Sequence, residues 1–336
     1  MMNGRLFLTA AALLLAGCSK SSQPDTPLRD TPISVNVLLP EILTRAGYGS
    51  DLPTLFYLSI DQLGTKYDYT NVVMKFEEGA WVAYESDEET AAKKQLLWEG
   101  TPTNIKVTAA TFSLDYTTTS PSYTLSASAD QSTDAKVKES DHLCYFNTDV
   151  YPSTEGISIE FGHIMSKLKI KLTLGTEYED ATDNPISSVA VFGSNIKGTY
   201  VLMPLTSIIP GQNSEGVVGG GTVIGGGTVT ANYKWSSLSD VSIIKSCPLT
   251  YTSSTATSPT ATYEAILIPQ TIAAKNFGVE ILIGDKTYEW KSTAEVTLEE
   301  GKEYTLELNA GKNKVSGSSF TASTWGSGTG ISSATE

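Results

Sequence analysis

The sequence predicts an all-β protein made of two sandwich-like domains. Short segments alternate apolar and polar residues with a period of two, as in residues 33–39 and 166–174. There are 28 Gly and 16 Tyr residues while charged residues make up only 18%, which favours turns and strands over helices. The length of 336 residues predicts two domains at about 150 residues each. No heptad repeat or long amphipathic helix argues for another class.

The net charge and the small number of His and Cys residues exclude several classes of function. The chain has 23 Lys and Arg against 37 Asp and Glu, a net charge of −14, so a phosphate backbone would be repelled and we expect no nucleic-acid partner. Two His and three Cys offer few nitrogen or sulfur ligands for transition metals. We therefore expect no cofactor, no metal site and no His- or Cys-dependent enzyme.

Residues 1–17 read as a lipoprotein signal peptide. One positive charge at Arg5 precedes the apolar run 6–15, which is too short to span a bilayer. The run ends in Leu-Ala-Gly-Cys at residues 15–18, which resembles the bacterial lipobox, whose Cys receives acyl chains. Lipidation at Cys18 would fix the exported protein to a membrane, since several acyl chains exceed the one-chain limit for stable anchoring. Residues 18–32 would be the tether.

The two remaining cysteines, Cys144 and Cys247, leave two interpretations open. They lie 103 residues apart, which permits a disulfide in an oxidising envelope but does not indicate one. Two buried free thiols are the preferred interpretation.

Domain bounds follow from the pattern of strands and turns. We expect an N-terminal sandwich over residues 33–175, beginning with the alternating strand 33–39. The polar, turn-rich stretch 175–185 would separate it from a C-terminal sandwich over residues 176–315. Residues 316–336 would form a tail.

Motifs that carry chemistry are weak. The acidic stretch 85–90 lacks the spacing of a calcium loop and reads as a solvated turn. His142 and His163 have no nearby nucleophile motif, so both read as structural residues. The repeated Gly-Gly-Gly-Thr-Val at 219–223 and 225–229 matches no phosphate-binding loop and reads as a surface loop. A carboxylate pair in a cleft would be needed for a hydrolase, and spacing alone does not reveal one.

Three segments in order resemble the fimbrillins of the Bacteroidales, the FimA- and Mfa-like pilins. Residues 161–170 are similar to the family's F-x-H-x-x-[SA]-K-L segment, residues 265–270 to its I-x-P-Q segment, and residues 298–306 to its GKxYT segment. The resemblance implies two transthyretin-like β-sandwich domains in tandem. It also implies a non-enzymatic structural subunit of adhesive surface fimbriae, whose lipidated precursor reaches the outer membrane.

The family's assembly route assigns roles to residues near the N-terminus. In fimbrillins an Arg-specific protease cuts after the first strand, and the groove left by that strand is filled by a neighbouring subunit. Here the only Arg after Arg29 is Arg45, so we expect cleavage between Arg45 and Ala46. Arg29 competes but precedes the strand. The displaced strand would contribute four apolar side chains, those of Ile33, Val35, Val37 and Leu39.

Two questions stay open at this point: whether the C-terminal segment is a donor strand, and whether the protein is a fimbrial subunit or an anchored adhesin. Stalk subunits carry a C-terminal donor segment, and here Phe320 and Ala322 alternate on one face with Trp325 on the other. Because this stripe is thin, a tip or accessory subunit that only accepts a strand stays open. Partners would be other fimbrial subunits, the processing protease and host or bacterial surface ligands. The alternative function is a permanently lipid-anchored adhesin or glycan-binding protein using Trp81, Trp98 or Trp235 as stacking platforms.

Overall fold

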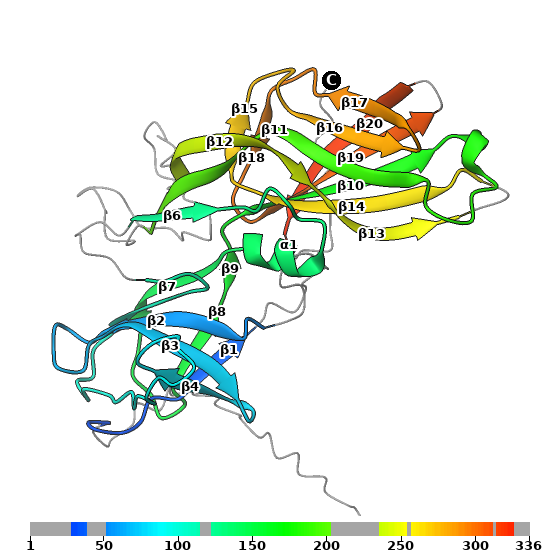
Figure 1. Ribbon diagram of the computed structural model, residues 1–336. Coiled ribbons are helices and arrows are strands. Elements are labelled where there is room, and N and C mark those ends of the chain that lie inside the picture. Colours follow the sequence, from blue (N-terminus) through cyan, green and yellow to red (C-terminus); the bar gives the residue numbers. More distant parts are fainter. Residues whose placement is uncertain are drawn as a thin grey trace, which may run out of the picture.

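The computed structural model describes residues 28–38, 52–114, 122–202, 235–253, 257–311 and 314–325. Their regular secondary structure is almost entirely β-strand, arranged in several sheets that are gathered into two lobes (Figure 1). The prediction of a mostly β protein is confirmed. Cys18, Leu39, Arg45 and Ala46 lie outside the described residues, so the expectations for them stay predictions.

The N-terminal lobe holds a six-stranded antiparallel sheet and a two-stranded parallel sheet. The large sheet has the order β4-β3-β2-β5-β7-β9, and the small one pairs β1 with β8. Its strands are β1 (Val35–Leu38), β2 (Leu55–Asp61), β3 (Tyr69–Glu77), β4 (Ala80–Tyr84), β5 (Ile105–Ala110), β7 (Leu143–Val150), β8 (Ile157–Glu160) and β9 (Gly162–His163).

Period-two alternation builds the core of this lobe. In β2 every second side chain is buried, namely Phe56, Leu58 and Ile60. They pack in one apolar cluster with Trp98 and with the inward side chains of β1 and β8. Apolar burial of this kind supplies the main driving force that holds the small sheet against the large one.

The C-terminal lobe is formed by two larger sheets and a small one. One has the order β13-β14-β10-β19-β20; the other has the order β12-β11-β16-β17, with β6 also paired to β11. A short sheet joins β15 to β18. The strands are β6 (Ser122–Ser126), β10 (Ser166–Leu174), β11 (Ile186–Val201), β12 (Trp235–Lys245), β13 (Cys247–Thr252), β14 (Thr260–Leu267), β15 (Gln270–Ile272), β16 (Gly278–Ile283), β17 (Lys286–Lys291), β18 (Val296–Leu298), β19 (Lys302–Gly311) and β20 (Lys314–Thr324).

β10 pairs with strands of the C-terminal lobe, whereas the boundary expected at residue 175 would place it in the N-terminal domain. β10 pairs with β14 and β19, and its inward side chains lie in the core of the C-terminal lobe. The polar stretch 175–185 is a turn inside this lobe, containing the 3-10 helix Thr176–Tyr178 and leading from β10 to β11. Turn-rich composition marks a chain reversal, and the same residue types serve a tight connection and an interdomain linker.

A third apolar cluster lies where the lobes meet. It contains Phe112 and Leu114 from the first half of the chain and Trp235, Ile266 and Trp325 from the second. The single α-helix of the described residues, α1 (Asp134–Ser140), belongs to this junction and lies beside β14 (Figure 1). The lobes are therefore held together by shared apolar burial as well as by the chain that connects them.

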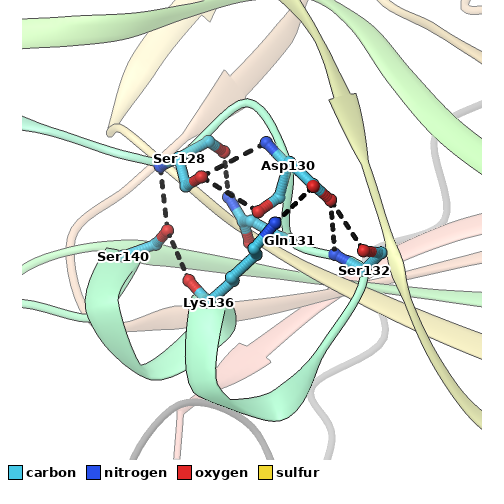
Figure 2. A network of polar contacts seen from close by, with 6 residues as sticks. All are labelled: Ser128, Asp130, Gln131, Ser132, Lys136 and Ser140. Carbon is cyan, nitrogen blue, oxygen red and sulfur yellow. Dashed lines mark hydrogen bonds and ion pairs between the residues drawn. The ribbon is translucent and has the colours of Figure 1, made fainter.

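A polar network fixes the turn that precedes α1 (Figure 2). The Ser140 hydroxyl accepts a hydrogen bond from the Ser128 amide at 2.9 Å and donates one to the Lys136 carbonyl at 2.9 Å. Asp130 forms an ion pair with Lys136. Gln131 is fully buried, and its side chain pairs with both backbone groups of Ile266, at 2.7 and 2.8 Å. The Gln131 side-chain amide thus supplies hydrogen-bond partners to the backbone of β14 at a point beyond the residues of β14 that pair with β13.

Glu264 is a buried carboxylate on the outer face of β14. Its cross-strand neighbours are Lys169 of β10 and Cys247 of β13, and Asp134 of α1, Lys167 of β10 and Glu303 of β19 also act on its charge. Among the described residues, Oε2 of Glu264 has no hydrogen-bond partner. Burial raises the pKa of Glu264 to about 7, while Lys167 opposes that rise.

Replacing Glu264 by Gln should make stability less dependent on pH. The folded protein holds the Glu264 proton more tightly than the unfolded chain, so the contribution of Glu264 to stability falls as pH rises from about 4.5 to 7. Between pH 5 and 8 we expect Glu264→Gln to gain about 3 kcal/mol of unfolding free energy relative to the wild type. Urea unfolding across this pH range measures the gain, with the exposed Glu280→Gln as control. A difference that does not change with pH contradicts the expectation.

Candidate functional site

The first-strand segment, residues 28–38, is bonded along both of its edges. The Asp30 amide donates to the Trp98 carbonyl at 3.0 Å, and the Ile33 amide donates to the Leu96 carbonyl at 2.9 Å. Further along, β1 pairs in parallel register with β8, from Val35 opposite Ile157 to Leu38 opposite Glu160. The segment therefore fills a slot between two stretches of backbone.

The apolar side chains of this segment enter the core of the N-terminal lobe. Ile33 and Val35 are 8% and 7% exposed, and Val37 packs against the same cluster while partly exposed. Leu38 points away from the core and is 51% exposed. The three apolar residues that the sequence placed on one face are thus the inward ones, as far as the described residues extend.

β8 depends on this segment for its backbone pairing. Within the described strands, β1 is the only one that pairs with β8. Just before β8, Gly156 has φ +84°, and a Cβ there would lie 2.1 Å from the Ser34 carbonyl oxygen. Glycine is required because the two backbones approach too closely for any side chain. β8 and the first strand therefore fit each other at atomic contact.

The C-terminal segment begins with β20, the edge strand of its sheet. β20 pairs antiparallel with β19, with Phe320 opposite Leu306 and Ala322 opposite Tyr304. The Phe320 ring stacks on Tyr304 with centroids 5.6 Å apart. Phe320 and Ala322 are only partly buried, whereas Leu306 of β19 is fully buried. β20 is thus held less firmly than the strand beside it.

Trp325 follows β20 and is buried at the junction of the lobes. Its ring lies flat on His163 of β9, with centroids 3.7 Å apart and planes 9° apart. Its backbone amide donates to the Gly301 carbonyl at 2.9 Å, and Lys167 Nζ lies 5.8 Å from its ring. His163 Nδ1 donates to Asp141 Oδ1 at 2.9 Å, and the Asp141 side chain has no exposed surface.

All three sequence motifs meet around this tryptophan, because residues 265–267 pair with residues 166–168 and Ile266 lies in the same apolar cluster as Trp325. The Gly301 amide donates to the Met165 carbonyl at 2.9 Å, and the Ser166 hydroxyl donates to the Glu299 carbonyl at 2.7 Å. Lys167 forms an ion pair with Glu303 at 2.7 Å. Segments 161–170 and 298–306 thus form one structural unit. The sequence carried no signal that would join Trp325 or Asp141 to this unit, because both lie outside the motifs.

The family model described as Fimbrillin-like matches residues 59–325. The chain belongs to the fimbrillin-like family. The resemblance found in the sequence is confirmed, and it places the chain in a family that is not enzymatic. The match spans both lobes and includes the junction around Trp325.

Solved structures similar to this fimbrillin-like chain come from Bacteroides species. A candidate cell adhesion protein of Bacteroides ovatus has a TM-score of 0.56 at 16% identity, with 87% of this chain and 97% of that chain covered. A candidate cell adhesion protein of Bacteroides uniformis has a TM-score of 0.48 at 12% identity, with 88% of this chain and 98% of that chain covered. A fimbrial protein of Bacteroides ovatus has a TM-score of 0.41 at 12% identity, with 84% of this chain and 49% of that chain covered. The first shows a shared fold. No functionally curated protein matches the chain.

Two of the three tryptophans named as stacking platforms are core residues of the fimbrillin-like chain. Trp98 is 1% exposed and Trp235 is 6% exposed, so neither presents a face to an external ligand. Trp81 is half-buried between Phe56 at 4.7 Å and Phe76 at 5.3 Å, measured between ring centroids. The burial of Trp98 and Trp235 fits the more frequent role of such residues, because large aromatic residues supply core volume as readily as binding surface.

The remaining polar candidates of the fimbrillin-like chain have structural surroundings. Burial lowers the pKa of His142, whose Nε2 lies 3.1 Å from the Ser126 carbonyl oxygen. Cys144 and Cys247 are free thiols. The described ranges contain no group of three or more His, Cys, Asp or Glu side chains arranged to hold a metal ion. None of the helices described is long and apolar enough to cross a membrane.

Shortening Val35 should destabilise the fimbrillin-like chain, whereas shortening Leu38 in the same strand should not. Val35→Ala removes two buried methyl groups, and we expect it to lower the unfolding free energy by about 2 kcal/mol. Leu38→Ala removes exposed atoms, and we expect a change within about 0.5 kcal/mol. Chemical denaturation compares the two variants. Equal losses would contradict the placement of β1.

Proposed function

We propose that the chain is a structural subunit of cell-surface fimbriae that loses its first strand after Arg45 and assembles by donor-strand exchange, contributing to adhesion. Membership of the fimbrillin-like family supports a surface role. The observation that carries the proposal is the first-strand segment, which fills a two-edged slot near the N-terminal end of the described chain. One cut between this segment and β2 would separate it from the rest of the lobe.

Loss of the first strand would create a groove that favours a replacement. Ile33 and Val35 each contribute about 1.5–3 kcal/mol by burial. Their departure would uncover the apolar residues beneath them and leave the backbones of 96–98 and 157–160 unpaired. Exposed apolar surface next to an open strand edge is a site for strand addition. An extended segment with alternating apolar residues from a second subunit fits this groove.

β20 is the segment we propose as the donor. It lies at a sheet edge, so its removal breaks pairing with β19 alone among the described strands. Phe320 and Ala322 repeat the i, i+2 spacing of Val35 and Val37. Trp325 lies beyond the strand and is buried in its own chain, so we do not include it in the donor stripe.

The leader completes the proposed route. Cys18 would be acylated, which would hold the precursor at the outer membrane until an Arg-specific protease cuts after Arg45. The same cut would remove the lipid anchor and open the groove, after which the subunit would join the cell-surface fimbrium. Two transthyretin-like sandwich domains in tandem are our interpretation of the two lobes.

A permanently anchored adhesin is the second function that the surface supports. Phe76 is 49% exposed and continues the aromatic row of Trp81. A shallow cavity of about 180 Å³ is lined by Trp81 together with Ile33, Lys94 and Leu96, among others. Aromatic faces beside polar groups suit a sugar ring. This function needs an uncut chain, so resistance at Arg45 favours it.

The cleavage site can be tested on a Cys18→Ser precursor. Treatment with an Arg-specific protease should yield a new N-terminus at Ala46, read by mass, and Arg45→Ala should abolish that product. Arg29→Ala is the matched control and should leave cleavage unchanged, because residues 30–33 are tied by backbone bonds to 96–98. A folded precursor that resists the protease at Arg45 contradicts the maturation scheme and favours the anchored adhesin.

A disulfide across β19 and β20 tests the donor. Thr305 and Thr321 face each other in the antiparallel register, where Cα atoms lie about 4.5–5.5 Å apart, within disulfide range. The cleaved Thr305→Cys/Thr321→Cys protein should stay monomeric when oxidised and form a multimer ladder after reduction. Thr321→Cys alone is the control and should assemble in both states. Multimers in the oxidised double variant exclude β20 as donor, and a control that never assembles indicates a tip or accessory subunit.

A further inference from the structure

The stretch 157–163 touches both segments of the proposed strand exchange. Its first part, β8, pairs with β1. Its last part, β9, ends at His163, which lies flat against Trp325. Only Phe161 separates the two strands, and it is anchored in the N-terminal core with its ring 5.4 Å from that of Phe56. A displacement of β8 therefore reaches His163 through very few residues.

On the N-terminal side, the stretch has little backbone support without the first strand. β8 has no other strand partner in the described ranges, and β9 contributes two residue pairs to β7. Ile157 and Ile159 are fully buried by contacts that include the side chains of the first strand. Loss of β1 would remove the whole ladder of β8 and part of this packing.

On the C-terminal side, Trp325 is the best buried residue at the end of β20. It is 7% exposed, whereas Ala322 and Ser323 are partly exposed and Thr324 is exposed. Its ring lies flat on the ring of His163, and the His163 ring is held in turn by Asp141. Because an edge strand frays from its end, the residue that pins this end sets how easily β20 leaves its sheet.

We propose that residues 157–163 couple the two segments: while the first strand is paired with β8, His163 holds Trp325 and β20 stays in its own sheet, and loss of the first strand frees β20. The coupling itself is a property of the single chain. Its role in assembly rests on the proposed function, because only there are both segments exchanged.

This coupling would order the events of assembly. A precursor whose groove is occupied would keep its donor strand folded, so it could neither accept nor donate. A processed chain would present an open groove and a loosened donor together. Such coupling requires one physical element whose state both sites bias, and 157–163 is the element that contacts both.

Hydrogen exchange on the uncut Cys18→Ser precursor tests the coupling in both directions. Val35→Ala, which weakens the first strand, should speed exchange of the β20 amides about tenfold, whereas Leu38→Ala should not. By reciprocity, Trp325→Ala should speed exchange of the β8 amides. Amides of β10 serve as the internal reference, since a general loss of stability would raise their exchange as well.

A matched control removes a different aromatic contact from β20. Trp290 packs over the β20 backbone at Gly317, where a Cβ would lie 2.6 Å from Trp290 Nε1. Trp290→Ala should speed exchange near residue 317 and leave β8 unchanged. If Trp325→Ala and Trp290→Ala affect β8 equally, or if Val35→Ala leaves β20 unchanged, the coupling is overturned. These measurements use neither protease nor polymer, so they can fail while cleavage and assembly succeed, and the reverse.

Discussion

The parallel pairing of β1 with β8 is the interaction on which the N-terminal lobe depends. Two-stranded parallel sheets are uncommon on their own, because parallel strands are normally covered on both faces. Here the pair is stable because Ile33, Val35, Ile157 and Ile159 lie in one apolar cluster beneath the six-stranded sheet. The pairing thus exists through the core that it covers, and removal of either strand exposes that core.

The free energy with which the first-strand segment is held can be compared with the stability of a whole domain. Backbone hydrogen bonds contribute about 0.5–1.5 kcal/mol each on balance, and each buried aliphatic side chain about 1.5–3 kcal/mol. The sum over the first-strand segment is comparable with the 5–15 kcal/mol that typically stabilises a whole domain. Under the proposed exchange, a strand held this firmly would stay in place in the uncut precursor, and an equivalent strand from another subunit would bind with similar strength.

Sequence patterns predicted several strands and their buried faces, but they did not predict which strands pair with one another. Alternation in β2 and β10 identified the buried faces, because one side of each strand lies in a core. The same pattern says nothing about which sheet a strand joins, so β10 was assigned to the wrong side of the boundary at 175. Helix α1 also escaped notice, since its seven residues give too little periodicity.

Within the candidate site, only the residues covered by strand alternation or by the family resemblance could be predicted from the sequence. Alternation placed Ile33, Val35 and Val37 on one face of a strand, and the role that we propose for them came from the family resemblance. The contact of Trp325 with His163 joins residues far apart in the sequence, and no local pattern encodes such a pair. The burial of Trp98 and Trp235 is likewise not encoded in any local pattern, because burial depends on the neighbours that the fold supplies.

An exchangeable strand must satisfy two opposing requirements. It must leave its sheet readily, which favours an edge position and partial burial, and the proposed donor β20 has both features. A loosely held edge strand also invites pairing with the wrong partner, which proteins suppress by covering or pinning the edge. Trp325 meets the second requirement without strengthening the strand itself, because it pins one end of β20 at the junction of the lobes. The holding contact lies on His163 of β9, close in the chain to β8, and under the proposed coupling the presence of the first strand on β8 would act on it.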